Sequence, residues 1–216
     1  MLSLTAAEPL RRVLAIGCHA DDIEIGCGGT LLTLARANPG LRVDWVVLAA
    51  QGARAEEARS SAAAFLDGVS DARVEVHDFR DGFLPYVGGE VKQVFEDLKG
   101  RVDPQVIFTH NGYDFHQDHR LACELTWNTF RNHLILEYEI PKVDGDIGRP
   151  NVFVPLTAAD VEYKLELLER HFPTQSGKHW FDPETFKGLM RLRGMEAVAP
   201  ERFAEAFTCR KATFTP

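Results

Sequence analysis

Residues 12–30 read RVLAIGCHADDIEIGCGGT, and the expected fold follows from this stretch. Its first six residues, RVLAIG, form a short apolar run with β-branched side chains, which predicts a buried strand. Polar side chains begin abruptly at His19, and glycines at positions 26, 28 and 29 precede a helical pattern over residues 30–37. A buried strand, a polar turn and a helix in this order indicate the first part of a βαβ unit.

The same alternation continues along the chain. The last third is less regular: it holds a turn-rich loop at 142–150 and a closing strand at 204–212. We therefore expect an α/β fold, a Rossmann-like, mostly parallel sheet flanked by helices, in a single domain over residues 1–216. The other expected strands are 43–50, 73–79, 105–109 and 134–140, and the other expected helices are 54–66, 91–99, 118–132, 160–171 and 183–193.

Composition narrows the class of protein. The chain has 216 residues, a formal net charge of −8 and no cluster of Lys and Arg, which argues against a nucleic-acid partner. No apolar stretch is long enough for a membrane span or resembles a signal peptide. Its four cysteines, Cys18, Cys27, Cys123 and Cys209, form no CxxC pair, so we expect neither a thiolate zinc site nor a redox motif. These features predict a cytoplasmic protein and leave open whether copies associate into a homo-oligomer.

Two polar clusters follow predicted strands. The first is His19-Ala20-Asp21-Asp22, and the second is His116-Gln117-Asp118-His119, beyond the strand at 105–109. Ligands bind at the carboxyl ends of strands in open α/β sheets, so the clusters can meet there. Two imidazoles and a carboxylate with an open fourth position are typical of catalytic zinc. Successive residues of a turn point in different directions, so His19 and Asp22 can face a metal while Asp21 faces the adjacent water.

Either cluster alone is weak evidence for a metal site, because His and Asp are common in loops. Two such clusters at two strand ends are much stronger evidence.

The first cluster, with Glu24 and the segment GCGGT at 26–30, resembles the signature of the PIG-L/LmbE-like deacetylases, usually AHPDDxExGxGGT. Residues 104–120, PQVIFTHNGYDFHQDHR, resemble the second signature of that family, which ends in HxDHR. This chain has Ala20 where the family usually has Pro, a change that removes no reactive group.

The resemblance implies a role for each matching residue. It implies that His19, Asp22 and His119 bind Zn²⁺, or another divalent ion such as Fe²⁺. It implies that Asp21 is the general base. It also implies that His116 stabilises the oxyanion or acts as the acid, with Asp118 as its orienting partner. The implied reaction is hydrolysis of an N-acyl bond, with an N-acetylglucosamine-type amino sugar as the small-molecule substrate.

Three further residues are weaker candidates. Arg54, just past the second expected strand, can bind a phosphate or hydroxyl of the substrate, or it can be a solvated arginine at a helix start. Asp81 can contact sugar hydroxyls, although a turn-forming Asp is the more ordinary interpretation. His110 ends the strand at 105–109, and we expect it to be buried or to support a metal ligand.

Competing functions remain open at this point. An amidase that cleaves a sugar-thiol conjugate could use the same residues. A dinucleotide-binding protein fits poorly, because the glycines at 26, 28 and 29 do not form GxGxxG and the acidic pair would face a pyrophosphate. A metal-binding module without catalysis is a further alternative. The sequence does not identify the carrier of the amino sugar.

Overall fold

The computed structural model describes residues 5, 6 and 8–213. One seven-stranded sheet runs through the molecule in the order β3-β2-β1-β4-β5-β7-β6. The first five strands of the chain pair in parallel, whereas β7 is antiparallel to both β5 and β6. The α/β, Rossmann-like fold with a mostly parallel sheet is thus confirmed. The strands are β1 (Arg12–Gly17), β2 (Arg42–Val47), β3 (Asp71–Val76), β4 (Val106–His110), β5 (Leu134–Tyr138), β6 (Val152–Leu156) and β7 (Phe203–Thr208).

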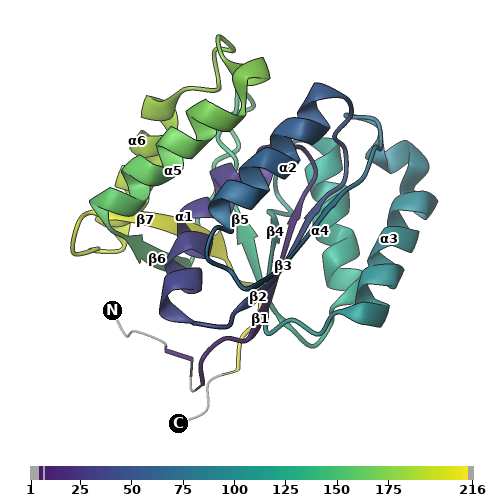
Figure 1. Cartoon of the computed structure of the whole chain (residues 1–216), viewed down its shortest axis with the longest axis horizontal. Helices are drawn as coiled ribbons and strands as arrows, with labels where there is room; N and C mark the ends of the chain where they lie inside the picture. Colours follow the sequence, from purple (N-terminus) through teal and green to yellow (C-terminus); the bar gives the residue numbers. More distant parts are fainter. Residues whose placement is uncertain (1–4, 7, 214–216) are drawn as a thin grey trace.

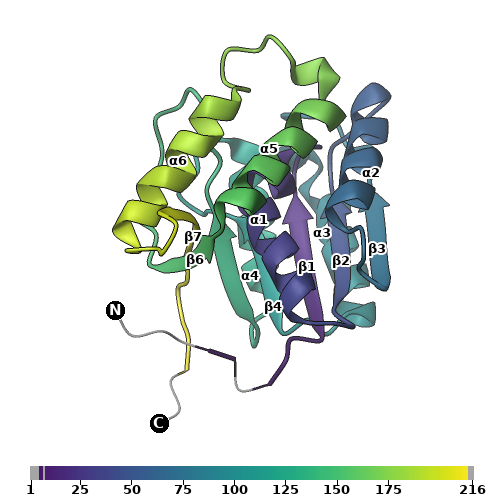
Figure 2. The ribbon, with the colours of Figure 1, turned by 60° about the vertical axis from the view of Figure 1, so that its left-hand side comes forward.

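Helices cover both faces of the sheet (Figures 1 and 2). One face carries α1, α2, α5 and α6, and the other carries α3 and α4. None of the helices in the described part of the chain is long and apolar enough to cross a bilayer. The helices are α1 (Asp22–Ala37), α2 (Ala53–Phe65), α3 (Gly88–Arg101), α4 (Gln117–Thr129), α5 (Ala158–His171) and α6 (Pro183–Glu196), with short 3₁₀ turns η1 (Leu84–Val87) and η2 (Pro173–Gln175).

The alternation of β1 explains why it lies in the centre. Val13 and Ala15 pack into the core beneath α1, α2 and α5, while Leu14 and Ile16 pack into the core beneath α3 and α4. A strand that is buried on both faces reads as a continuous apolar run, which is why its pattern was clear in the sequence.

The order of strands creates a topological switch point. The chain builds outward from β1 through β2 to β3, and then places β4 on the opposite side of β1. The connections that leave β1 and β4 therefore diverge to opposite faces of the sheet. Ligands bind in the crevice at such a point, so the fold itself brings residues 18–22 and 111–119 together.

The start of α1 differs from the expectation. We expected the glycines at 26, 28 and 29 to precede a helix that begins at Thr30, but the helix begins at Asp22 and includes them. A Cβ on Gly26 would lie 2.2 Å from Cδ2 of Tyr138, and a Cβ on Gly28 would lie 2.6 Å from Cε1 of Phe65. The glycines therefore allow close packing of α1 rather than forming a loop.

Strand β6 was not predicted from the sequence. Its residues, Val152–Leu156, include Pro155, which lacks a backbone N–H and is tolerated mainly at sheet edges. β6 is indeed the edge strand beside β7. The predicted closing strand is confirmed, although it spans Phe203–Thr208 and ends before the expected residue 212.

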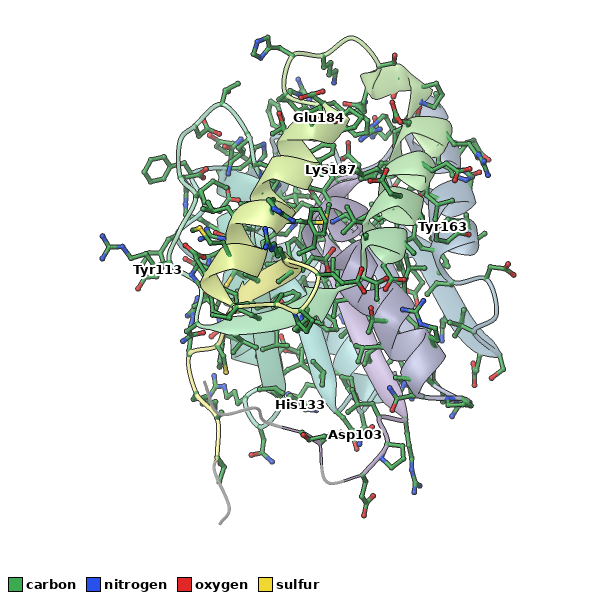
Figure 3. The ribbon with its side chains drawn as sticks, turned by 90° about the vertical axis from the view of Figure 1, so that its left-hand side faces the viewer. Asp103, Tyr113, His133, Tyr163, Glu184 and Lys187 are labelled. Carbon is green, nitrogen blue, oxygen red and sulfur yellow. The ribbon has the colours of Figure 1, made fainter. Side chains whose placement is uncertain are left out.

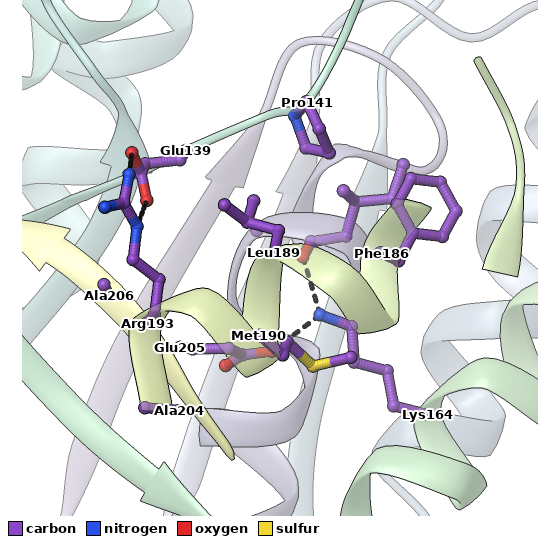
Figure 4. Close-up of a pocket in the computed structure, with 12 residues that line it drawn as sticks. Glu139, Pro141, Lys164, Phe186, Leu189, Met190, Arg193, Ala204, Glu205 and Ala206 are labelled. Carbon is purple, nitrogen blue, oxygen red and sulfur yellow. Dashed lines mark hydrogen bonds and ion pairs between the residues drawn. The ribbon is translucent and has the colours of Figure 1, made fainter. Parts of the chain in front are cut away.

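A buried ion pair joins the last third of the chain to α1 (Figure 4). Nζ of Lys164 lies 2.7 Å from Oε1 of Glu205 and donates to the carbonyl oxygen of Ile25 at 2.6 Å. The Glu205 carboxylate also accepts the backbone N–H groups of Gly29 and Thr30 at 2.8 and 2.6 Å. Because both charges are hydrogen-bonded, this pair links α5 and β7 to the helix that begins at the polar turn after β1.

The close contact at Gly26 gives a stability prediction. Gly26→Ala should lower the free energy of unfolding by about 1–3 kcal/mol, because the added methyl group would overlap the buried Tyr138 ring. Gly188→Ala is the control: it is exposed within α6 and has open space around its Cβ, so it should be neutral or slightly stabilising. Urea denaturation measures both. Equal effects of the two changes would contradict the packing argument.

The ion pair gives a second prediction. Lys164→Met should cost about 3–5 kcal/mol of unfolding free energy, because it leaves the Glu205 carboxylate buried without its cation. Lys187→Met removes an exposed ion pair with Glu162 on the outer side of α6 and should cost far less than Lys164→Met (Figure 3). Thermal and chemical denaturation compare the two. A Lys164 variant as stable as the Lys187 variant would contradict the linking role.

Candidate functional site

Three side chains from the two polar clusters meet beyond the carboxyl ends of β1 and β4. Nδ1 of His19 lies 3.2 Å from Nε2 of His119 and 3.3 Å from Oδ2 of Asp22. Nε2 of His119 lies 3.5 Å from the same Asp22 oxygen. His19 and Asp22 flank the start of α1, and His119 lies in the first turn of α4.

The donor set and its spacing fit a tetrahedral divalent cation. Nitrogen and oxygen ligands at about 2.1 Å from a tetrahedral Zn²⁺ are separated from one another by about 3.4 Å. The three donor atoms of His19, Asp22 and His119 are 3.2 to 3.5 Å apart. Without a cation, these three polar groups would crowd together with their lone pairs converging. These residues therefore fit a metal, and all three line the pocket.

Each histidine of the triad is oriented by a carboxylate at its other ring nitrogen. Nε2 of His19 lies 3.2 Å from Oδ2 of Asp118, and Nδ1 of His119 lies 2.9 Å from Oδ2 of Asp114. A proton on each of these nitrogens leaves the lone pairs on Nδ1 of His19 and Nε2 of His119, the two atoms that face one another. Carboxylates in this position fix the tautomer and ring orientation of metal-binding histidines.

The position of Asp118 corrects one expectation. Its carboxylate contacts His19 and accepts the backbone N–H groups of Gly82 and Leu84 at 2.7 and 3.1 Å. His116 instead accepts the backbone N–H of Asp118 at its Nδ1, at 3.3 Å. The Asp118 side chain therefore orients His19 rather than His116. Alternation along the turn explains the difference, because neighbouring side chains leave the backbone in different directions.

Asp22 is held by the residues around it. One of its oxygens, Oδ2, accepts the backbone N–H of His19 at 2.6 Å and lies 3.1 Å from Nε2 of His110. Although burial would raise the pKa of Asp22, the neighbouring His119, His110 and His19 lower it well below its usual range. Asp22 is thus ionised at neutral pH. His110 is fully buried, as expected, and supports this carboxylate.

Asp21 points to a different partner from Asp22. Its Oδ1 lies 2.9 Å from a guanidinium nitrogen of Arg54, and its buried Oδ2 has no hydrogen-bond partner among the described residues. Burial raises the pKa of Asp21, and the positive charge of Arg54 opposes that rise. Arg54 also donates to Glu57 at 2.7 Å, so its two terminal nitrogens are already engaged. Its guanidinium positions Asp21 as well as lining the pocket.

His116 and Asp81 complete the polar lining. Burial, and then the neighbouring His19, lower the pKa of His116 below its usual value. His116 is therefore neutral at pH 7 and, because Nδ1 accepts a hydrogen bond, its proton is on Nε2. Oδ1 of Asp81 lies 3.0 Å from Nε2 of His19, and the Asp81 side chain is 76% exposed.

Most of the predicted site residues border one cavity of about 440 Å³, whereas the fully buried Asp118 does not line it. The predicted residues at this cavity are His19, Asp21, Asp22, Arg54, Asp81, His116 and His119. Its outer wall includes Lys142, Gln175 and Trp180, from the loop after β5 and the segment after α5. His133, by contrast, lies at the amino-terminal edge of the sheet, where it pairs with Asp103 (Figure 3).

Sequence reasoning missed several supporting residues. Asp114 holds His119, and Nζ of Lys142 in turn lies 3.0 Å from Asp114. Glu57 holds Arg54 and accepts the backbone N–H and hydroxyl of Thr174, both at 2.7 Å. Asp114 could have been suspected, since it lies five positions before a candidate metal ligand. The contacts of Lys142 and Thr174 depend on long-range folding and had no local signal.

Comparisons with known proteins found one curated relative and several solved structures of similar fold. The chain is 28% identical over 182 residues to the uncharacterized deacetylase YaiS of Escherichia coli strain K12, covering 78% of this chain and 94% of that protein. The fold resembles that of N,N'-diacetylchitobiose deacetylase from Pyrococcus horikoshii, with a TM-score of 0.70, 21% identity and coverage of 93% and 84% of the two chains. It also resembles GalB, the 4-carboxy-2-hydroxymuconate hydratase of Pseudomonas putida KT2440, with a TM-score of 0.76, 18% identity and coverage of 96% and 99%.

The two solved structures share the fold, so the assignment to a family depends on the sequence. The model of the PIG-L family, described as GlcNAc-PI de-N-acetylase, matches residues 14–130. That range includes both polar clusters and more than half of the chain. The chain belongs to the PIG-L family of de-N-acetylases.

Proposed function

We propose that this protein is a metal-dependent N-deacetylase that hydrolyses the acetamide of an N-acetylglucosamine-type amino sugar. The proposal depends chiefly on the three converging donor atoms of His19, Asp22 and His119. These residues would hold Zn²⁺, or Fe²⁺, since imidazole and carboxylate ligands suit both ions. Membership of a deacetylase family supports the choice of reaction.

The reaction needs an activated water and a base to take its proton. A divalent cation at this site would lower the pKa of water and polarise the amide carbonyl. Asp21 is the general base, because its free Oδ2 is buried beside the triad while Arg54 holds its Oδ1. The raised pKa of Asp21 makes its carboxylate a better proton acceptor than an exposed aspartate.

His116 acts on the other side of the scissile bond. Its neutral ring donates through Nε2–H, which can stabilise the developing oxyanion of the tetrahedral intermediate. The leaving amine then takes the proton that Asp21 accepted from the water, as the carbon–nitrogen bond breaks. Asp118 supports this step indirectly, since its backbone N–H fixes the His116 ring and its carboxylate fixes His19.

The cavity is large enough for an amino sugar. Its volume of about 440 Å³ lies within the usual range for small-molecule sites. Phe79 and Trp180 supply aromatic surface on which a sugar face can stack, and Asp81 supplies a carboxylate for sugar hydroxyls. A chitobiose derivative is the substrate named for the similarly folded enzyme from Pyrococcus horikoshii, which favours a related sugar here.

Two other reactions need to be separated from deacetylation. The similarly folded GalB is named as a hydratase, so addition of water to a carbon–carbon double bond is an alternative for this fold. Cleavage of a sugar-thiol conjugate is a second alternative that would use the same residues.

The decisive assay measures acetate and free amine from a panel of N-acetyl sugars, with and without a chelator. We expect both products in equal amounts, loss of activity with chelator and recovery with Zn²⁺ or Fe²⁺. Activity that persists after complete removal of metal would contradict the proposal. Products without acetate would favour one of the alternatives.

The assignment of the base predicts a separation of metal binding from catalysis. Asp21→Asn should retain the metal, because the three donor atoms lie on other residues, but lower kcat by about 10²–10⁴-fold. Metal analysis and steady-state kinetics on the same preparation test this. Full activity of the variant would show that another group takes the proton.

The orienting role of Asp118 predicts an effect on metal affinity. Asp118→Asn should weaken binding by about 10–100-fold, because the His19 ring loses the carboxylate that fixes its tautomer. Asp103→Asn is the matched control, since it removes a carboxylate from His133 at the opposite edge of the sheet (Figure 3). Competition with a chromogenic chelator measures both affinities. An Asp118 variant that binds metal as tightly as the control would rule out this role.

A further inference from the structure

A buried network of charges leads from the loop after β5 to His119. Oδ2 of Asp114, which lies 2.9 Å from Nδ1 of His119, also lies 3.0 Å from Nζ of Lys142. The same ammonium group lies 2.5 Å from Oδ2 of Asp146. The side chains of Lys142, Asp114 and Asp146 are 12%, 4% and 3% exposed, so water and salt screen these charges only weakly. One cation is therefore shared by two buried carboxylates.

The two carboxylates have few other partners. Oδ1 of Asp114 accepts the backbone N–H of His116 at 2.7 Å, and Oδ2 of Asp146 accepts that of Phe115 at the same distance. The buried Oδ1 of Asp146 has no hydrogen-bond partner among the described residues. In the part of the chain that the structure describes, Lys142 is the only lysine or arginine that pairs with either carboxylate.

The loop that carries Lys142 is firmly anchored. Arg193 of α6 donates to the Glu139 carboxylate at 2.6 and 2.8 Å, at the start of the loop (Figure 4). Arg193 also donates to the carbonyl oxygen of Gly148 at 3.1 Å, and the backbone N–H of Gly148 donates to Glu139 at 3.2 Å. Both ends of the loop thus share one ion pair, which gives Lys142 a fixed support.

This loop serves the cavity as well as His119. Val143 and Asp144, which follow Lys142, line the cavity together with it. The residues that match the family model end at 130, so the loop lies outside that range. The wall of the cavity and the support of His119 therefore belong to one segment, which the family match does not cover.

We propose that Lys142 is a positioning residue, which fixes the Asp114 carboxylate against His119 and thereby orients the His119 ring for the metal. The inference rests on the proposed function in taking Nε2 of His119 as a ligand. Without the ammonium group, the carboxylates of Asp114 and Asp146 would repel one another in a buried setting, and Asp114 would turn away from the ring. His119 would then lose the acceptor that fixes its tautomer.

Competition between the full chain and a chromogenic chelator for Zn²⁺ tests this role. Lys142→Met should weaken Zn²⁺ binding by about tenfold, as expected for a group that supports a metal ligand. Lys178→Met is the matched control: it removes an exposed lysine of the same cavity and should leave the affinity unchanged. Lys142→Arg should recover most of the lost affinity, because a guanidinium can contact both carboxylates.

A double-mutant cycle shows whether Lys142 acts through Asp114. Asp114→Asn alone should weaken Zn²⁺ binding by about 10–100-fold, and adding Lys142→Met should weaken it little further. If Lys142→Met alone does not fold, Lys142→Met with Asp146→Asn is compared with Asp146→Asn instead. That background leaves one buried carboxylate without its cation rather than two, and the same tenfold loss is expected.

The outcomes separate this proposal from the proposed function. Equal Zn²⁺ affinities of Lys142→Met and Lys178→Met, or full additivity with Asp114→Asn, would overturn the positioning role while the metal site stands. A raised KM with unchanged Zn²⁺ affinity would also overturn it, since Lys142 would then be a contact for the substrate. A wild type that binds no Zn²⁺ would instead contradict the metal-dependent function.

Discussion

The convergence of His19, Asp22 and His119 over the junction of β1 and β4 is the constraint on which the site depends. Their donor atoms are 3.2 to 3.5 Å apart, with Asp22 and His119 almost completely buried and His19 partly buried. Polar groups brought so close need a shared partner, because desolvation and lone-pair repulsion otherwise cost free energy. Topology makes this approach unavoidable, since β4 lies beside β1 and both strands end at the same edge.

Surrounding residues keep that arrangement rigid. Asp118 and Asp114 fix the two imidazoles, and Arg54 turns one oxygen of Asp21 away so that the other stays free. Farther out, Glu205 and Lys164 hold α1, the helix whose first residue is Asp22. A metal centre on such a framework needs little rearrangement before reaction, which is the main source of electrostatic catalysis.

Local patterns in the sequence were sufficient for the sheet, apart from the edge strand β6, and for the residues at its carboxyl edge. The apolar run of β1 and the polar clusters after β1 and β4 all carry short-range signals, and the two clusters match a family signature. The start of α1 was predicted too late in the chain. Its glycines allow close packing against Tyr138 and Phe65, and these contacts are distant in sequence. The partner of Asp118 was also misassigned, since spacing cannot tell which side chain of a turn faces which neighbour.

The central claim is that His19, Asp22 and His119 share one metal ion. X-ray diffraction from crystals of the Zn²⁺-loaded protein, recorded on both sides of the zinc absorption edge, tests it most directly. The account predicts one strong anomalous peak within bonding distance of Nδ1 of His19, Nε2 of His119 and Asp22. A fully loaded protein whose strongest peak lies elsewhere, or in which the two imidazoles bind different ions, would contradict it.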